Sequence, residues 1–249
     1  MREVVTKDSL NHIASKYHLN TKITDKDFDK HFHQLCFEWA RSFFTISPNI
    51  LEMGYGEGNV TKELLDEGCN VDIVEGAELL TIQAKERFGS SINIYHSLFS
   101  EFIPPRNYDF ILATNILEHV DNPSETLKNI GNWCSSSTKV ILTVPNSDSI
   151  HRRLSVIMGI QESNDTLSPR DYIVGHQRVY SYEKLIAEVN LAGFDVIAQK
   201  GFLLKILPNS MMKDMSKDLV EAFYKIADQI DIRYTADIGI LLEKRDQGK

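Results

Sequence analysis

Residues 49–58 constrain the fold more than any other stretch of this chain. They read as a buried strand, Asn-Ile-Leu-Glu-Met, followed by a turn with glycine at positions 54, 56 and 58. Glycine has no side chain, so such a turn can take positive φ angles and let a ligand approach the backbone closely. A helix is predicted from about residue 59, and a second short apolar strand ends in Glu75. This order predicts half of a nucleotide-binding sheet, with Glu75 placed to accept hydrogen bonds from both hydroxyls of a ribose.

The chain after residue 48 alternates strands and helices, which is typical of an α/β fold. The predicted strands are residues 49–53, 70–74, 92–96, 108–113, 139–144, 194–199 and 236–242. The predicted helices are residues 59–68, 77–87, 123–134, 181–192 and about 214–230. Seven strands with interleaved helices predict one doubly wound sheet, mostly parallel, with helices on both faces.

Two segments fall outside this alternation. Residues 7–46 carry a broad apolar face rich in aromatic side chains, which predicts helices. Residues 146–175 are polar and irregular, and a connection of this length without clear strands usually serves as a lid or substrate segment. We therefore expect an N-terminal helical lid at residues 1–47 and a ligand-binding domain at 48–249. An insert at about 146–180 would complete the cap over the sheet.

The composition excludes several classes of protein. The net charge is −8 and no Lys/Arg block is present, so no nucleic-acid partner is expected. Cys36, Cys69 and Cys134 are scattered without metal-ligand spacing, which predicts free buried thiols, and no metal is expected. No apolar run is long enough to span a membrane or to act as a signal peptide, so we expect a cytoplasmic location without membrane attachment.

The glycine spacing separates two kinds of cofactor. A dinucleotide fingerprint would place its third glycine where Asn59 stands. The observed Glu52-Met-Gly-Tyr-Gly-Glu-Gly instead resembles motif I of class I S-adenosylmethionine (SAM) methyltransferases. Further blocks resemble a bacterial small-molecule subgroup of that family: Tyr108 to Pro123, Val144-Pro-Asn and Gly175-His-Gln-Arg-Val-Tyr. The resemblance covers about residues 48–200. It implies the seven-stranded methyltransferase sheet with its last strand antiparallel, with SAM as cofactor and S-adenosylhomocysteine as product.

The resemblance also implies which residues meet the cofactor. The turn formed by Gly54, Tyr55, Gly56 and Gly58 would pass under the methionine moiety, and Glu75 with Gly76 would hold the ribose. Many members of the family have an aspartate after the third strand, where this chain has Ser97. Adenine contacts would then come from the backbone near Leu98 and from the side chains of Leu98 and Phe99. Asn115 follows the fourth strand and would line the methyl-transfer region, whereas Glu52 would either enter the cofactor site or only tie down the glycine loop.

Three segments carry candidate groups for catalysis and substrate binding. His176 is the leading candidate for a general base, because a histidine can accept a proton near neutral pH. The alternative is that His176 and Arg178 only pin the insert to the core. His119 is the weaker catalytic candidate, since it could simply brace its loop. His151 and Arg152 could bind an anionic group of the substrate, because arginine suits carboxylates and phosphates. Arg178 and Tyr180 are further substrate-binding candidates.

Together, the motifs and the resemblance predict a SAM-dependent methyltransferase that acts on an oxygen or nitrogen of a small molecule. One alternative is a non-catalytic SAM-binding partner subunit. Another is an NAD(P)-dependent oxidoreductase, which Asn59 and the lack of a Tyr-x-x-x-Lys pattern disfavour. The cluster Met211-Met-Lys-Asp-Met predicts an apolar patch on the cap or an oligomer contact, so a homodimer is also among the expectations.

Overall fold

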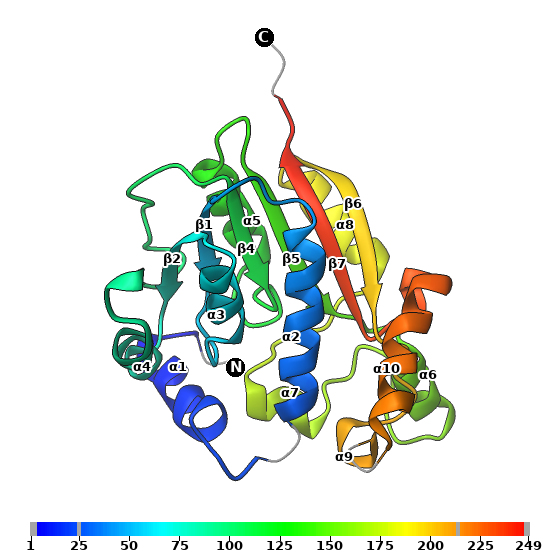
Figure 1. Cartoon of the computed structure of the whole chain (residues 1–249). Helices are drawn as coiled ribbons and strands as arrows, with labels where there is room; N and C mark the ends of the chain where they lie inside the picture. The colour runs from blue at the N-terminus through cyan, green and yellow to red at the C-terminus, as the bar shows by residue number, and fades with distance from the viewer. Residues whose placement is uncertain (1–3, 24–25, 213–214, 247–249) are drawn as a thin grey trace.

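Seven strands form one sheet in the computed structural model, which describes residues 4–23, 26–212 and 215–246 (Figure 1). The strand order is β3-β2-β1-β4-β5-β7-β6. The strands are β1 (Asn49–Met53), β2 (Asn70–Glu75), β3 (Ile92–His96), β4 (Phe110–Thr114), β5 (Lys139–Pro145), β6 (Phe194–Phe202) and β7 (Asp237–Lys244). The last strand, β7, runs antiparallel to both β5 and β6, while the pairs from β3 to β5 are all parallel. The predicted fold class is confirmed.

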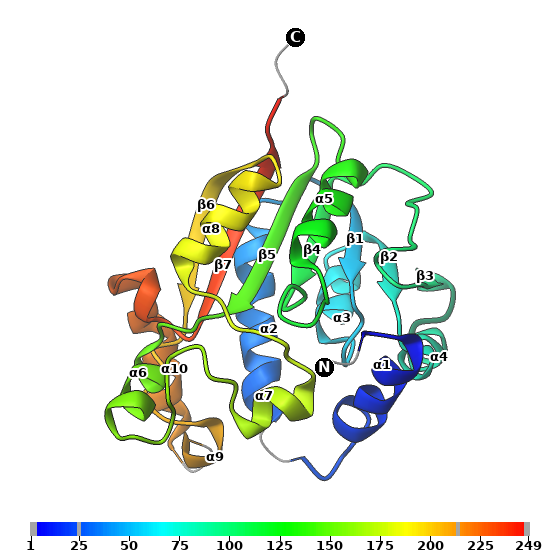
Figure 2. The same cartoon turned by 180° about the vertical axis from the view of Figure 1, so that it is seen from behind.

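Helices cover both faces of this sheet, as Figure 1 and Figure 2 show from opposite sides. One face carries α2 (Lys26–Arg41), α3 (Asn59–Asp66) and α4 (Glu78–Phe88). The other carries α5 (Pro123–Trp133) and α8 (Tyr182–Leu191). Each face has its own apolar core, and the buried strands contribute side chains to both cores in turn. This two-sided burial explains why the central strands read as continuous apolar runs.

Local sequence signals fix several helix ends. At α5, the Asn122 side chain accepts a hydrogen bond from the backbone N–H of Glu125, and Pro123 stands in the first turn. At α8, the Ser181 hydroxyl caps the start by accepting from the N–H of Lys184. The chain leaves α8 through Gly193, whose φ of 86° is costly for other residues. These two helices lie where the sequence predicted them.

The N-terminal region is helical, as predicted, but it is broken into separate pieces. The first piece is α1 (Lys7–Ile13), which continues as a π-helix at Ala14–His18. The second piece is α2, which ends at Arg41. The π-helical turn is a rare conformation that a search for ordinary helical periodicity does not detect.

The segment 146–175 differs from the sequence prediction of an irregular connection. It contains α6 (Ile150–Ile157) and α7 (Pro169–Val174). A signal for α7 is present in the sequence, because Ser168 and Asp171 form a reciprocal capping box and Pro169 follows the cap. Both helices are short, so they show too few turns for a clear apolar period. The prediction of an irregular insert was therefore wrong in its local structure.

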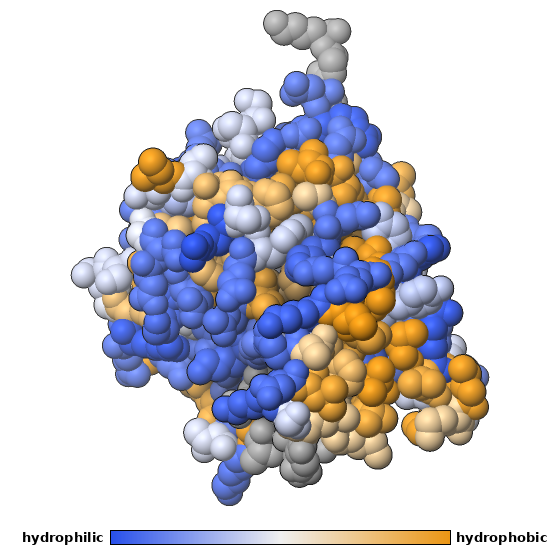
Figure 3. All heavy atoms as spheres, turned by 45° about the vertical axis from the view of Figure 1, so that its right-hand side comes forward, coloured by the Kyte–Doolittle hydropathy of each residue, from blue (hydrophilic) through white to orange (hydrophobic). Residues whose placement is uncertain are grey.

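The late helical region is also more divided than predicted. It comprises α9 (Asn209–Met212), α10 (Lys217–Ile226) and short 3₁₀ turns at Ala227–Gln229 and Ile232–Tyr234. Of the predicted Met cluster, Met211 is exposed and Met212 is buried, while residues 213 and 214 lie outside the described residues. Figure 3 shows hydrophobic side chains gathering on the lower part of the face where α6, α9 and α10 lie. Exposed apolar side chains on or next to α6, α9 and α10 include Ile157, Met158, Ile160, Met211 and Leu219.

The structure also bears on the predictions for the cysteines and for membrane-spanning segments. Cys36, Cys69 and Cys134, which all fall within the described ranges, are free and buried, as predicted. Among the described helices, none is both long and apolar enough to cross a lipid bilayer.

Candidate active site

A cavity of about 640 Å³ opens at the carboxyl ends of the central strands. In open α/β sheets this edge is where ligands bind. The cavity walls come from the ends of β1, β2 and β4, from the N-terminal helices and from the insert between β5 and α8. Most of the residues predicted from the sequence line it, and these are Glu52, Gly54, Tyr55, Gly56, Glu75, Gly76, Ser97, Leu98, Phe99, Asn115, His119, His151, Arg152 and His176.

The glycine turn forms one end of this cavity. Gly54, Gly56 and Gly58 all have positive φ, at 77°, 56° and 69°. A Cβ atom on Gly58 would stand 2.5 Å from the ring of Tyr55, so a side chain there would displace the turn. Gly58 itself does not line the cavity, but it caps the start of α3. Its conformation therefore shapes the site without contributing a contact to it.

Glu75 connects the end of β2 to this turn. Its Oε2 accepts a hydrogen bond from the backbone N–H of Tyr55 at 2.8 Å, and its Oε1 accepts from the N–H of Ala77 at 2.7 Å. Burial raises the pKa of the Glu75 carboxyl, whereas these backbone N–H groups oppose the rise. A carboxylate has about four lone-pair positions, so two can still receive hydroxyl groups from the cavity side.

Glu52 is buried at the end of β1 and is held by α3. The Thr61 hydroxyl donates to Glu52 Oε2 at 2.7 Å. Burial raises the pKa of Glu52 to about 8, although the hydrogen bond from Thr61 opposes this rise. The group is therefore mostly protonated at neutral pH, which favours the interpretation that Glu52 ties the strand to the helix after the glycine loop.

This pKa predicts a measurable effect on stability. A carboxyl group with a higher pKa in the folded than in the unfolded state binds more protons when folded. The free energy of unfolding therefore falls as pH rises from about 5 to about 8, with a slope of about 1 kcal/mol per pH unit from this group. Glu52→Gln should remove that contribution. The free energy of unfolding of the variant should therefore rise relative to that of the native protein as the pH rises. Urea unfolding at pH 6 and pH 8 measures it, and an equal pH dependence in both proteins would contradict the assignment.

Ser97, after β3, and Asn115, after β4, also line the cavity. The backbone N–H of Ser97 donates to the carbonyl of Glu75 at 3.0 Å, and the Ser97 hydroxyl donates to the carbonyl of Leu98. Asn115 follows β4 with a φ of 54°, a conformation that asparagine tolerates better than most residues. Its Oδ1 accepts from the Thr143 hydroxyl at 3.1 Å. This bond orients the asparagine side chain, which lines the cavity.

The opposite wall contains a chain of buried charged groups. Asp171 Oδ1 stands 2.9 Å from Nδ1 of His176, and its Oδ2 accepts from Nη2 of Arg152 at 2.8 Å. The Ser168 backbone N–H and hydroxyl also donate to Oδ2. Burial works against the ionised form of Asp171, but the hydrogen bond to His176 and the Arg152 charge outweigh it, so the pKa of Asp171 lies below its usual range. Asp171, which the sequence reasoning missed, thus orients the His176 ring.

The segment after α7 clamps the loop after β4. Arg178 Nη1 donates to the carbonyl oxygens of Leu117, at 2.8 Å, and Val120. The backbone N–H of Gln177 donates to the Glu118 carbonyl at 2.7 Å. Tyr180 is fully buried in the core below the sheet edge. Neither Arg178 nor Tyr180 lines the cavity, so the structure does not bring these two substrate-binding candidates to the site.

The anion-binding candidates are placed differently from the expectation. His151 lines the cavity, and burial, with the Lys205 and Arg152 charges, lowers its pKa to about 2. It is therefore a neutral group. Arg152 reaches the same wall, but its guanidinium is committed to Asp171 and to the Thr166 carbonyl at 2.9 Å. The two residues do not form a free cationic pair for an anionic substrate.

Glu118 and His119 lie on the loop that Arg178 clamps. Burial and the neighbouring His176 hold the pKa of His119 well below its usual range. Burial also raises the pKa of Glu118 to about 7, although the nearby His176 opposes the rise. Glu118 was not among the site residues predicted from the sequence, although it directly precedes His119. Tyr17, His18 and His33 from the N-terminal helices also line the cavity, whereas His31 pairs with Glu221 outside it.

Comparison with known proteins shows the family to which the chain belongs. Residues 26–199 match the protein family described as "Methyltransferase domain". The chain belongs to this family, and its identification as a class I SAM-dependent methyltransferase is confirmed. The oxidoreductase alternative is thereby set aside.

Particular relatives support the same class. A ubiquinone biosynthesis O-methyltransferase of Rickettsia canadensis (strain McKiel) is 24% identical over 191 residues, which are 74% of this chain and 73% of the relative. The 1,6-didemethyltoxoflavin-N1-methyltransferase of Burkholderia thailandensis, solved with 1,6-didemethyltoxoflavin and S-adenosylhomocysteine, has a TM-score of 0.63 and 14% identity over 99% of this chain and 93% of its own. The N-methyltransferase NodS of Bradyrhizobium japonicum WM9, solved with S-adenosylhomocysteine, has a TM-score of 0.59 and 12% sequence identity. The match covers 97% of this chain and 98% of NodS. At sequence identities this low, the similarity of these two structures to the present chain shows a shared fold and nothing more.

Proposed function

We propose that this methyltransferase binds SAM in the cavity and transfers its methyl group to an oxygen or nitrogen of a small molecule. The observation that carries the proposal is the cavity itself, which joins the glycine turn and Glu75 at one end to His119 and His176 at the other. The names of the relatives include both O- and N-methyltransferases, so they support the two kinds of acceptor equally.

The cofactor would follow the carboxyl edge of the sheet. The turn from Gly54 to Gly56 would contact the methionine moiety, and Glu75 would accept hydrogen bonds from the ribose hydroxyls. Adenine would lie against Leu98 and Phe99, both of which line the cavity beyond Gly76. In this orientation the sulfonium methyl group would point past Asn115 towards the wall formed by His119 and His176.

The reaction needs one displacement and the loss of one proton. A lone pair of the acceptor forms the new bond to the methyl carbon while the electrons of the C–S bond return to sulfur, giving neutral S-adenosylhomocysteine. The acceptor's proton leaves towards the histidine wall, where His176 is the first candidate to promote its loss. Much of the acceleration would come from holding donor and acceptor in line within a closed cavity.

We further propose that residues 1–47 act as a lid over the domain at 48–249, with the insert at about 146–180 as the second half of the cap. The backbone N–H of Val5 donates to Asp121 at 2.8 Å, and Arg170 donates to the Tyr17 hydroxyl at 2.9 Å. The Leu10 side chain is so close to Gly76 that a Cβ there would meet it at 2.4 Å. These contacts join the N-terminal helices to both walls of the cavity.

The net charge and the exposed apolar side chains support further proposals on the acceptor, the location and the oligomeric state. A net charge of −8 supports a small acceptor in place of a nucleic acid, and we propose a cytoplasmic location. The exposed apolar side chains of α6 and α9 support a homodimer through that face.

The proposed function is tested by methyl transfer from isotope-labelled SAM into a desalted small-molecule extract of the source cells, with mass analysis of the products. A labelled small molecule is the expected result. Label found only on macromolecules would contradict a small-molecule acceptor. Tight SAM binding without any transfer, in extracts from several growth conditions, would favour the non-catalytic partner subunit.

The ribose assignment predicts the effect of Glu75→Ala. Loss of a charged hydrogen-bond acceptor should weaken SAM binding by about 1.5–3 kcal/mol, roughly 10- to 150-fold in Kd. Titration calorimetry measures this, with Glu78→Ala, an exposed acid three residues later, as the matched control. Unchanged affinity in Glu75→Ala would remove Glu75 from the cofactor site. A loss of equal size in both variants would show a general effect of charge.

A further inference from the structure

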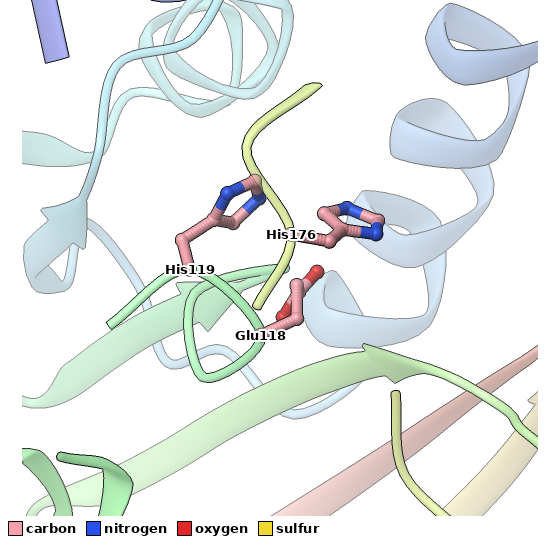
Figure 4. Close-up of side chains that lie close together, drawn as sticks. All are labelled: Glu118, His119 and His176. Carbon is pink, nitrogen blue, oxygen red and sulfur yellow. The ribbon is translucent and has the colours of Figure 1, made fainter. Parts of the chain in front are cut away.

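Glu118, His119 and His176 gather three potential metal ligands at the acceptor end of the cavity (Figure 4). One ligand atom from each lies within 4.8 Å of the other two. Glu118 and His119 come from the loop after β4, and His176 comes from the segment after α7. The two segments are held together because Gln177 donates backbone and side-chain hydrogen bonds to the carbonyls of Glu118 and His119, at 2.7 and 2.8 Å.

The carboxylate of Glu118 is the first unexplained feature of this cluster. The side chain is 0% exposed, and neither of its oxygens has a hydrogen-bond donor in suitable geometry among the described residues. The Asn115 amide lies close enough to lower the pKa of Glu118, but it does not meet that geometry. Burying a carboxyl group without partners costs free energy, and a bound cation is one partner that would offset this cost.

The orientation of the two histidines is the second, independent feature. Nδ1 of His119 lies 3.2 Å from the Gly175 carbonyl, and Nδ1 of His176 lies 2.9 Å from an oxygen of Asp171. Both partners are acceptors, so in each ring Nδ1 carries the hydrogen and Nε2 of the neutral ring keeps its lone pair. Metal-binding histidines are oriented in the same way, by a carboxylate or a backbone carbonyl at the other nitrogen.

Asp171 is itself held in place. Arg152 and Ser168 donate to its second oxygen, at 2.8 Å for the guanidinium and 2.7 Å for the backbone N–H. The His176 ring therefore has a fixed support behind it. Figure 4 shows the imidazoles of His119 and His176 and the carboxylate of Glu118 close to one another, and the ring centroids of the histidines are 4.8 Å apart at an interplanar angle of 75°.

We propose that Glu118, His119 and His176 bind one divalent cation. Two imidazole nitrogens and one carboxylate oxygen suit Zn²⁺, Co²⁺, Mn²⁺ or Fe²⁺ better than Mg²⁺ or Ca²⁺, which prefer oxygen ligands. Ligand atoms around one such ion stand about 3–4 Å apart, so a movement of about 1 Å closes the cluster. The earlier expectation of no metal rested on cysteine spacing, and this cluster uses no cysteine.

Three protein ligands leave coordination positions open towards the cavity, which His119 and His176 both line. The inference rests here on the proposed function. An acceptor hydroxyl at an open position would release its proton to water in the cavity more easily, because a bound cation lowers the pKa of its ligands. In that case His176 promotes proton loss as a ligand of the cation, and the acceptor oxygen is methylated while bound.

The test is a direct binding measurement on the full-length protein after chelator treatment and dialysis. Titration with Co²⁺, followed by its visible absorption, and with Mn²⁺, followed by the resonance of the free ion, should each show one equivalent bound per chain. Zn²⁺ should displace Co²⁺. Glu118→Gln, His119→Ala and His176→Ala should each weaken binding at least tenfold, whereas His12→Ala, at an exposed histidine on α1, should not.

The controls separate this inference from the proposed function. Stabilisation of each variant by S-adenosylhomocysteine verifies that it is folded. Absence of stoichiometric Co²⁺ and Mn²⁺ binding overturns the metal site, and so does binding that survives all three substitutions. Methyl transfer that persists in metal-free protein at full rate would contradict a role for the cation in the reaction, while the proposed function would stand.

Discussion

His176→Ala is expected to lower turnover about 10²- to 10⁴-fold while it leaves the affinity for S-adenosylhomocysteine nearly unchanged. His176 lies on the wall opposite the glycine turn, and its ring is fixed by Asp171 at 2.9 Å. We expect the substitution to affect turnover because the proposed function assigns His176 to the acceptor and not to the cofactor. Steady-state kinetics at saturating acceptor, with titration calorimetry of S-adenosylhomocysteine, measure both quantities.

The matched control for this prediction is His12→Ala, which removes an exposed histidine of the same size from α1. Near-native turnover in His176→Ala would show that the residue only pins the insert. A parallel loss of cofactor affinity would instead indicate that the cavity has collapsed, and thermal unfolding of the two variants distinguishes that case.

Arg152→Met is expected to lower the free energy of unfolding by about 3–5 kcal/mol, the usual cost of breaking a buried ion pair by removing one partner. The side chain of Arg152 is 7% exposed, and its guanidinium donates to Asp171 and to the Thr166 carbonyl. Without it, Asp171 would remain buried with only the His176 ring as a potential cation. Methionine keeps most of the volume, so the loss of charge and of hydrogen bonds dominates the effect.

The neighbouring residue supplies an unusually close control. Arg153 pairs with Asp148 at 3.1 Å, but its side chain is 42% exposed. Exposed ion pairs contribute about 0–1 kcal/mol, so Arg153→Met should change stability little. Equilibrium unfolding in urea compares the two variants. A change below about 1 kcal/mol for Arg152→Met would show that the Arg152–Asp171 pair does not stabilise the insert.

The order of the elements was largely readable from the sequence. The central strands β4 and β5 are nearly continuous apolar runs, and the helix starts at Asn122 and Ser181 have side-chain caps. Both signals act over a few neighbouring residues. The insert was misread because α6 and α7 are only eight and six residues long, too short for an apolar period to stand out.

Of the candidate site residues, those around the glycine turn and Glu75 line the cavity more completely than those of the block at residues 175–180. The glycine turn and Glu75 are adjacent in the βαβ unit, so their local order already implies their contact, which the bond from Tyr55 N–H to Glu75 realises. Arg178 and Tyr180 looked like substrate ligands because they are polar residues near His176. The tertiary structure directs one to the backbone of the loop after β4 and buries the other in the core.

The sequence by itself determined the class of fold and the glycine turn after β1, because apolar periodicity, caps and glycines at positive φ are properties of short segments. Only the tertiary structure decided that Glu118 and His119 meet His176, and that Asp171 and Arg152 stand behind it. These groups come from segments separated by dozens of residues. Their contact depends on how the insert packs onto the loop after β4, and no local pattern in either segment specifies that packing.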